Sequence, residues 1–365
     1  MSTIALTGGG TAGHISPLLA VAQELSESAR CVVIATRGGR EDELVPERFP
    51  IIHRVPKLPF PRRISPAALR FPLRWLQAVV AARRALREAR VDVVVGFGGY
   101  TAAPVYLAAW SLRIPLVIHE ANAIAGLANR LGARLTRAVG VCFPGTALPH
   151  ATVVGMPLRA EVLAIDRPAQ RSAARQHFGL DADTPVLLVT GGSSGARTLN
   201  DTLDRVGADI VAQGWQVLHL RGPGHEAPSP PPQGVTHVEY TERMDLALAS
   251  ADLVVSRAGA NAVAELALVG LPAIFVPYHV GNGEQQRNAA SAVSAGGALQ
   301  VSTADFAPEW VHAVLLPLLN DRERVAAMGE AMAATARVDG ATIMARWALD
   351  AVGGGKGRAD ASTTH

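Results

Sequence analysis

The chain has 365 residues, which is enough for two domains of about 150 residues each. Nearly half of the residues are hydrophobic (49%) and 18% are charged, so the composition excludes intrinsic disorder over most of the length. The formal net charge of +3 is too small to indicate a nucleic-acid partner.

Neither the first residues nor the cysteines suggest an exported protein. Residues 1–10 lack a basic segment followed by a long apolar run, and no stretch of about 18 apolar residues predicts a membrane-spanning helix. Cys31 and Cys142 lie far apart in apolar stretches, which is typical of buried thiols rather than of a disulfide framework or a zinc site. We therefore expect a cytoplasmic protein.

Short apolar runs alternate with longer alanine-rich stretches along almost the whole chain. Residues 91–95, 115–118, 186–189 and 253–255 are such runs, rich in Val, Ile and Leu. Their hydrophobicity is continuous instead of alternating, so we expect parallel strands covered by helices on both faces. The predicted fold class is α/β.

The chain also contains an internal repeat. Residues 4–14 and residues 186–196 each have the pattern of a strand, a glycine-rich turn and the start of a helix. Two tandem Rossmann-like domains explain this pattern most simply. We place an N-terminal domain at residues 1–160, a C-terminal domain at 161–345, and the end of a C-terminal helix with a disordered tail at 346–365.

Three glycine-rich turns are candidates for phosphate binding, at residues 8–13, 96–99 and 191–195. A turn that leads into a helix presents backbone N–H groups and the positive end of the helix dipole, so it binds phosphate without a metal. Tight turns also need glycine for packing alone, but three of them indicate substrates with more than one phosphate group. We expect the site beyond the carboxyl ends of the strands, between two facing domains.

Two of these turns, and one acidic pair outside them, allow other interpretations. Residues 8–13 match the dinucleotide-binding pattern, and because the second strand ends at Arg37 and not at an acid, an NADP-dependent oxidoreductase is the version to consider. Residues 191–195 match the nucleophile elbow of hydrolases. Asp181 and Asp183 resemble a metal-binding acidic pair, but they precede a strand, which favours a turn.

Polar side chains lie beside these turns and at the predicted strand ends, where the core does not need them. They are His14, Tyr100, His119, Glu120 and Asn122 in the first half, and Arg257, Asn261, Glu265, Gln285, Gln286 and Asn288 in the second. Asn261 and Glu265 share one helical face, and a carboxylate there can accept two hydrogen bonds from a ribose diol. His14 is either a catalytic imidazole or a helix-start histidine bonded to water.

Positive charge is concentrated in residues 56–90, where nine cations and one anion give +8. When the segment is projected as a helix that begins at Leu69, one arc of the helix is polar. This arc contains Arg70, Arg74, Gln77 and Arg84. The rest of the projection is apolar and holds Leu69, Phe71, Leu73, Trp75, Leu76, Val79, Val80 and Leu86. The segment is either a domain-packing helix with solvated arginines or an amphipathic helix that binds an anionic membrane.

Seven segments resemble glycosyltransferase family 28, in the order of that family and spread over residues 4 to 300. They are residues 9–14, 95–100, 119–126, 155–159, 191–197, 256–260 with Glu265, and 285–288. The resemblance implies the two-domain GT-B fold and an inverting transferase of peptidoglycan synthesis. Such an enzyme moves N-acetylglucosamine from UDP-N-acetylglucosamine to the 4-hydroxyl of undecaprenyl-diphosphate-linked N-acetylmuramoyl pentapeptide.

The resemblance also implies roles for individual residues. The implied donor-binding residues are Thr11, Ala12, Gly13, Asn122, Arg159, Ser193, Thr241, Ala260, Asn261, Ala262, Val263, Ala264, Glu265, Gln285 and Gln286. Among them, Glu265 would hold the ribose, Ser193 a phosphate, Arg159 and the backbone near Thr241 the uridine end, and the two glutamines the sugar hydroxyls. The implied acceptor-binding residues are Gly9, Gly10, Gly98, Gly99 and Tyr100, and the membrane-binding residues are Leu69, Arg70, Phe71, Leu73, Arg74, Trp75 and Leu76.

The family pattern gives no undisputed catalytic base. His14 is the first candidate because imidazole exchanges protons near neutral pH, and Glu120 is the alternative. The chain departs from the family at Ala12, Ser194 and Met156, where glycine, glutamine and asparagine are usual. These departures leave the donor geometry at those positions open.

The resemblance implies no cofactor and no metal. It implies four partners: UDP-N-acetylglucosamine, the polyprenyl-diphosphate-linked muramoyl peptide, a membrane surface with anionic lipid, and other proteins of cell-wall synthesis or division. It places the enzyme at the cytoplasmic face of the cell membrane as a peripheral protein, with no nucleic acid bound. The rival hypotheses are another GT-B transferase with a lipid or natural-product acceptor, the NADP-dependent oxidoreductase, and a nucleotide-sugar sensor or scaffold without turnover.

Overall fold

The computed structural model describes residues 1–9, 12–39, 41–46, 49–56, 58, 66–228, 230–278, 282–337 and 340–359. The chain divides into two compact units, which we call unit 1 (residues 1–159 and 338–365) and unit 2 (residues 160–337). The first division falls one residue before the predicted position. The predicted end of the C-terminal domain at residue 345 is wrong, because the chain from residue 338 onward clusters with unit 1.

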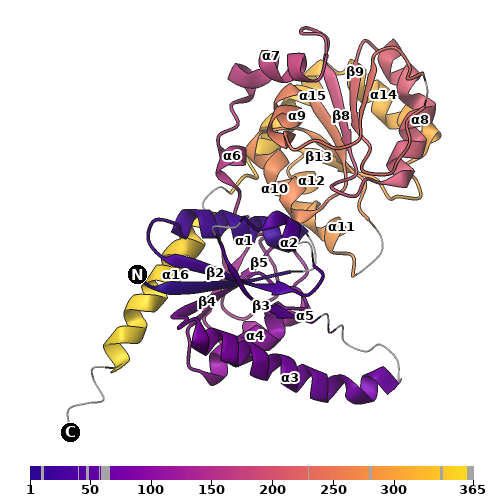
Figure 1. The fold of residues 1–365 in the computed structure, drawn as a ribbon. Coiled ribbons are helices and arrows are strands. Elements are labelled where there is room, and N and C mark those ends of the chain that lie inside the picture. The colour runs from indigo at the N-terminus through magenta and orange to yellow at the C-terminus, as the bar shows by residue number, and fades with distance from the viewer. Residues whose placement is uncertain are drawn as a thin grey trace. The chain divides into compact units, whose positions relative to one another are not determined.

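Unit 1 contains a parallel sheet of seven strands in the order β3-β2-β1-β4-β5-β6-β7 (Figure 1). The strands are β1 (Thr3–Thr7), β2 (Arg30–Thr36), β3 (Ile51–Val55), β4 (Val93–Gly96), β5 (Leu116–Glu120), β6 (Ala138–Val141) and β7 (Ala151–Val153). From β1, the strands β2 and β3 are added on one side of the sheet and β4 to β7 on the other, so the order of addition reverses between β1 and β4. Such a switch point is where doubly wound sheets bind ligands.

Helices cover both faces of this sheet, as the continuous burial of its central strands requires. They are α1 (Ala12–Leu25), α2 (Glu41–Leu44), α3 (Pro66–Glu88), α4 (Ala102–Ser111), α5 (Leu127–Gly132) and α16 (Gly340–Ala359). Helices α1 and α16 lie on one face of the sheet and α3, α4 and α5 on the other (Figure 1). Ile4 and Leu6 of β1 pack in the core with α1 and α16, whereas Ala5 packs in the core with α3, α4 and α5.

The C-terminal helix α16 explains the corrected domain boundary. Its Met344, Ala345 and Ala348 are buried beside α1 and the central strands of unit 1. A sequence pattern shows that a helix has an apolar face but does not show which sheet that face covers. The helix end predicted within residues 346–365 is present up to Ala359, and the predicted tail beyond it lies outside the described residues.

Unit 2 contains a parallel sheet of six strands in the order β10-β9-β8-β11-β12-β13 (Figure 1). The strands are β8 (Val186–Thr190), β9 (Gln216–Leu220), β10 (Val235–Val238), β11 (Leu253–Ser256), β12 (Ala273–Phe275) and β13 (Ala298–Gln300). Numbered from β8, this is the same order as in unit 1 without its last strand. The internal repeat therefore predicted two copies of one topology correctly.

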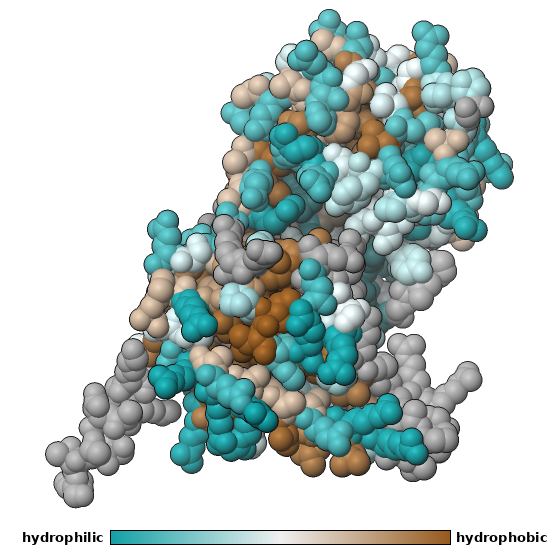
Figure 2. All heavy atoms as spheres, viewed as in Figure 1, coloured by the Kyte–Doolittle hydropathy of each residue, from teal (hydrophilic) through white to brown (hydrophobic). Residues whose placement is uncertain are grey.

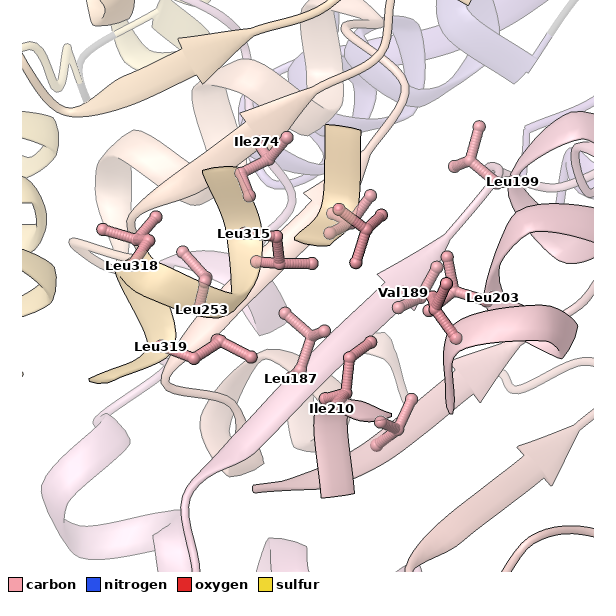
Figure 3. Close-up of a cluster of buried hydrophobic side chains, with 14 of the residues drawn as sticks. Leu187, Val189, Leu199, Leu203, Ile210, Leu253, Ile274, Leu315, Leu318 and Leu319 are labelled. Carbon is pink, nitrogen blue, oxygen red and sulfur yellow. The ribbon is translucent and has the colours of Figure 1, made fainter. Parts of the chain in front are cut away.

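The helices of unit 2 also cover both sheet faces. They are α6 (Ala160–Leu163), α7 (Arg167–His177), α8 (Arg197–Ala212), α9 (Met244–Ser250), α10 (Ala260–Leu268), α11 (Glu284–Asn288), α12 (Ala290–Ser294), α13 (Pro308–Trp310), a π-helical turn (Val311–Leu315), α14 (Leu316–Asn320) and α15 (Arg322–Ala333). Figure 3 shows one core, in which Leu187 and Val189 of β8 meet Leu203 of α8 and the leucines of the π-helical turn and α14.

Several local predictions can be compared directly with the structure. All four predicted strands are present as β4, β5, β8 and β11. Both cysteines are buried free thiols. The turn predicted at Asp181 and Asp183 is confirmed, since the Asp181 carboxylate accepts hydrogen bonds from the N–H groups of Asp183 (3.0 Å) and Thr184 (2.8 Å).

The described residues contain neither a membrane-spanning helix nor a group of metal ligands. None of the helices formed by them has both the length and the apolar composition of a membrane span. In the same part of the chain, no three His, Cys, Asp or Glu side chains are grouped as ligands for a metal ion.

Candidate active site

Two glycine-rich loops of unit 1 touch at the carboxyl edge of its sheet. Gly99, in the β4–α4 loop, has φ +84°, and a Cβ built on it would lie 2.3 Å from the Gly9 carbonyl oxygen of the β1–α1 loop. A Cβ on Gly8 would lie 2.8 Å from Cβ of Phe97. Only glycine permits this approach, so the structure brings the predicted acceptor-binding residues of the two loops together. The predicted residues Gly10 and Thr11 lie outside the described residues.

The predicted residues around these loops differ in exposure. His14 is half-buried in the first turn of α1, and Gly13 before it is exposed. Tyr100 is 54% exposed on the neighbouring loop. The hydroxyl oxygens of Thr36 and Thr101 lie 2.5 Å apart and join the end of β2 to the residue before α4, which fixes that loop further.

Glu120 ends β5, is 3% exposed, and has both carboxylate oxygens in hydrogen bonds. It accepts them from the N–H groups of Asn122 (2.9 Å) and Gly126 (3.0 Å) and from Nδ2 of Asn129 (2.9 Å). Burial raises the pKa of this carboxyl, and the hydrogen bonds oppose that shift. A carboxylate enclosed in this way is well suited to hold residues 121–126 in place and poorly suited to take a proton from a substrate.

His119 is fully buried beside Glu120 and forms a hydrogen bond with a different segment, residues 155–159. Its Nε2 lies 2.8 Å from the carbonyl oxygen of Gly155, and burial lowers its pKa to about 4. Gly155 opens the predicted segment 155–159, in which Met156 is buried and Arg159 is exposed. A methionine side chain suits this buried position, in which an asparagine would need hydrogen-bond partners.

In unit 2, the β8–α8 loop is fixed by packing of its backbone. Gly195 has φ +72°, and a Cβ there would lie 2.2 Å from the Arg221 carbonyl oxygen. Asn200 of α8 donates a hydrogen bond to the same oxygen (3.1 Å) and contacts Nε2 of His219 through its Oδ1 (2.9 Å). Ser193 lies exposed on this loop, and Ala196, the N-cap residue of α8, makes no side-chain capping hydrogen bond.

The second loop of unit 2 connects β11 to α10, where six donor-binding residues were predicted. Asn261 and Glu265 are half-buried one turn apart on α10, and Ala262 and Ala264 are half-buried too. The Asn261 Oδ1 atom is buried and finds no hydrogen-bond partner among the described residues. The side chains of Ala260 and Val263 are buried in the unit and leave only their backbone for a ligand.

The loop after β12 is tied to its surroundings by three polar side chains. Arg257 donates from Nη1 to the Val276 carbonyl oxygen (2.9 Å) and to Oγ1 of Thr303 (2.8 Å), and burial lowers its pKa. Gln285 accepts a hydrogen bond at Oε1 from the N–H of Tyr278 (2.9 Å), so its amide nitrogen remains the group to offer a sugar.

Three further predicted residues of unit 2 lie on or beside the same edge. Gln286, next to Gln285 on α11, is exposed. Asn288 donates from Nδ2 to the Ala258 carbonyl oxygen (3.2 Å), which anchors the β11–α10 loop. Thr241 follows β10 and accepts a hydrogen bond at its hydroxyl from the N–H of Arg243 (3.0 Å).

The predicted site omits four residues that support its loops: Tyr106 and Asn129 in unit 1, and Asn200 and His219 in unit 2. All four are buried polar residues behind the loops. A tyrosine in an otherwise apolar helix and an asparagine inside a short helix were the available signals, because buried polar groups must find partners. Their partners are distant in sequence, so the contacts themselves could not be predicted.

The structure divides the predicted membrane-binding residues of α3 into two faces. Phe71 and Trp75 are half-buried and pack against the core of unit 1, in which Leu86 of the same apolar arc is fully buried. The exposed row consists of Leu73 (61%), Leu76 (58%) and Val80 (58%), with Arg70, Arg74 and Arg84 also exposed. Figure 2 shows hydrophobic side chains over α3, beside hydrophilic ones. The side chain of Leu69 is outside the described part of the helix.

Two tandem Rossmann-like units with glycine-rich loops at the carboxyl edges of their sheets are the layout of the GT-B fold. The model of the "Glycosyltransferase family 28 N-terminal domain" matches residues 4–141, and that of the "Glycosyltransferase family 28 C-terminal domain" matches residues 186–343. The chain belongs to glycosyltransferase family 28 and is a hexosyltransferase.

Individual relatives agree with this assignment. A protein of Clavibacter sepedonicus, named UDP-N-acetylglucosamine--N-acetylmuramyl-(pentapeptide) pyrophosphoryl-undecaprenol N-acetylglucosamine transferase, is 54% identical over 96% of this chain and 97% of its own. A protein of Leifsonia xyli subsp. xyli with the same name is 51% identical over 93% of this chain and 96% of its own. The crystal structure of Acinetobacter baumannii MurG matches with a TM-score of 0.79 at 28% identity, covering 96% of this chain and 100% of that one.

Proposed function

We propose that this chain transfers N-acetylglucosamine from UDP-N-acetylglucosamine to the 4-hydroxyl of undecaprenyl-diphosphate-linked N-acetylmuramoyl pentapeptide, with inversion at the anomeric carbon. The observation that carries the proposal is 54% identity, over 96% of the chain, to a relative named for this transfer. Family membership favours it over the oxidoreductase and hydrolase hypotheses, whose motifs are the same glycine-rich loops.

Unit 2 binds the donor in this proposal. The Ser193 hydroxyl, the loop N–H groups and the positive end of α8 hold the diphosphate. Glu265 accepts hydrogen bonds from the ribose diol, and the buried Oδ1 of Asn261 gains a donor that it lacks in the described chain. Gln285, with its carbonyl oxygen already bonded, offers its amide N–H groups to the sugar hydroxyls.

Unit 1 binds the acceptor and supplies the base. The N–H groups of the two touching glycine loops hold the acceptor diphosphate. His14 removes the proton from the 4-hydroxyl as that oxygen forms its bond to the anomeric carbon. The bond from that carbon to UDP breaks, and its electron pair leaves on the diphosphate, where the loop N–H groups of unit 2 stabilise the charge.

The acceptor carries a polyprenyl chain, so the enzyme meets it at a membrane surface. The exposed apolar row on α3, Leu73, Leu76 and Val80, supports a peripheral contact with the cytoplasmic leaflet. The exposed arginines beside the row, Arg70 and Arg74, add attraction to anionic lipid of about 1 kcal/mol each. Other proteins of cell-wall synthesis or division are further partners in this proposal.

The test is transfer of labelled sugar to a short-chain analogue of the lipid acceptor. We expect product with UDP-N-acetylglucosamine and much slower transfer from UDP-glucose and UDP-N-acetylgalactosamine. The product should carry a β-linkage, which nuclear magnetic resonance of the anomeric proton reports. Absence of transfer by a folded protein that binds UDP would contradict the proposal.

A further inference from the structure

Tyr106 fills the space between two glycines of unit 1. It is fully buried on α4, and a Cβ on Gly96, the last residue of β4, would lie 2.1 Å from its ring. A Cβ on Gly132, at the end of α5, would lie 2.6 Å from the other side of the ring. The two glycines leave a slot for one aromatic ring, so the position of the tyrosine is set by backbone on both sides.

The hydroxyl group of Tyr106 joins a substrate loop to the next helix. Its oxygen accepts a hydrogen bond from the N–H of Gly98 (3.2 Å) in the β4–α4 loop, and it donates to Oδ1 of Asn129 (2.8 Å) on α5. Burial raises the pKa of Tyr106, so the hydroxyl keeps the proton that it donates. Both sides of the hydroxyl are therefore in use.

Asn129 continues the connection to the loop after β5. Its Nδ2 donates to the carbonyl oxygen of His119 (3.0 Å) and to Oε2 of Glu120 (2.9 Å). Glu120 in turn holds the N–H groups of Asn122 and Gly126, as described above. One chain of hydrogen bonds thus runs from Gly98 to Asn122. The family resemblance implies that Gly98 binds the acceptor and Asn122 the donor.

We propose that Tyr106 is a positioning residue for the transfer reaction. Its hydroxyl fixes the glycine loop that holds the acceptor relative to the loop of Asn122, and so sets the geometry in which the acceptor hydroxyl meets the donor sugar. Tyr106 touches neither substrate and acts through Gly98 and Asn129. The inference depends on the proposed function for the identity of the reaction and on the hydrogen-bond chain for the role of the residue.

The experiment compares Tyr106→Phe with Thr136→Val in the full chain. Tyr106→Phe removes one oxygen and keeps the ring in its slot. The Thr136 hydroxyl also accepts one hydrogen bond (from Ala138 N–H, 3.1 Å) and donates another (to the Leu116 carbonyl oxygen, 2.5 Å), but it lies at the amino edge of the sheet. The control thus removes the same number of hydrogen bonds from the same unit, away from the substrate loops.

We expect Tyr106→Phe to lower kcat by about tenfold or more and to leave the KM for UDP-N-acetylglucosamine within about twofold, because misplaced reactants cost rate more than donor affinity. Amide hydrogen exchange without substrate should accelerate in residues 97–100 and 121–126. Thr136→Val should lower the melting temperature similarly and keep kcat.

Asn129→Ala breaks the next link, so it should show the same loss of kcat, and the double variant should be no worse than the worse single variant. If Tyr106→Phe does not fold, Asn129→Ala alone carries the test. Wild-type kcat in the tyrosine variant, or an equal loss in Thr136→Val, would overturn the inference while wild-type transfer still supports the function. Absence of transfer by the wild-type protein would overturn the function instead.

Discussion

The two units share one strand order but fix their loops in different ways. Both pack backbone closely at glycines, at Gly99 in unit 1 and at Gly195 in unit 2. Unit 1 adds a chain of hydrogen-bonded side chains that joins two loops, with Tyr106 and Asn129 at the centre and the Glu120 carboxylate as the terminal acceptor. Unit 2 adds charge pairs such as Arg221 with Asp204, whose two bonds measure 2.5 and 2.9 Å. The same topology therefore does not determine how a site is held.

The difference follows the chemistry proposed for each unit. A diphosphate is recognised largely by backbone N–H groups, so a loop with a fixed backbone that leads into a helix is sufficient in unit 2. Unit 1 must also present a hydroxyl and a base at a defined distance, which requires several loops to keep one mutual geometry. A buried polar network supplies such rigidity when all of its members are satisfied.

The largest expected effect separates catalysis in unit 1 from binding in unit 2. His14→Ala should lower kcat by about 10²- to 10⁴-fold, because a general base typically accelerates a reaction by that factor. The affinity for UDP should stay unchanged. The measurement is steady-state transfer together with calorimetric titration of UDP. His177→Ala, an exposed histidine of unit 2, is the control. Wild-type turnover in His14→Ala would remove His14 from the role of base.

The stability of each unit should depend on pH through one buried histidine, His119 in unit 1 and His219 in unit 2. Burial lowers the pKa of His119 in unit 1 to about 4 and that of His219 in unit 2 to about 3. Between the ordinary value of about 6.5 and these values only the unfolded state binds the proton, so stability is full above pH 6.5 and falls as pH decreases. For His119 the loss from pH 7 to pH 5 is about 2 kcal/mol.

Differential scanning calorimetry at the two pH values measures this effect. His119→Gln should make the unfolding of unit 1 less dependent on pH, and His219→Gln should do the same for unit 2. An unchanged pH dependence in both variants would mean that these histidines do not couple protonation to folding.

Glu265→Gln should impair donor binding in unit 2 and leave acceptor binding in unit 1 unchanged. The substitution keeps the size of the side chain but removes its charge, and hydrogen bonds to charged groups contribute about 1.5 to 3 kcal/mol. We expect the KM for UDP-N-acetylglucosamine to rise by about tenfold or more, with a smaller change in kcat and with the acceptor KM unaffected. Glu309→Gln, on an exposed residue of the same unit, is the control. A rise in the acceptor KM alone would move Glu265 out of the donor site.

The sequence predicted those features that depend on neighbouring residues. Continuous apolar runs located β4, β5, β8 and β11, and the repeated strand–glycine–helix pattern predicted two copies of one sheet. The sequence did not predict features that depend on contacts between segments far apart in the chain. The apolar face of α16 is compatible with either sheet, the projection of α3 could not show that Phe71 and Trp75 face the core, and no local pattern links Tyr106 to Gly98.

The smallest expected effect concerns the exposed row on α3, for which we propose a membrane contact. Replacing Leu73, Leu76 and Val80 by Ser should weaken binding to vesicles that contain anionic lipid by about fivefold to tenfold, because the row loses apolar area that a membrane would bury. Leu163→Ser, on a leucine of unit 2 that is 42% exposed, should change nothing.

Salt dependence then separates the two contributions to this binding. Co-sedimentation of the wild-type chain should weaken as salt screens Arg70 and Arg74, whereas the residual binding of the triple variant should depend on salt just as strongly, since its arginines remain. Equal binding of wild type and triple variant would show that the apolar row does not enter the membrane. The basic residues alone would then account for the attraction of unit 1 to the membrane.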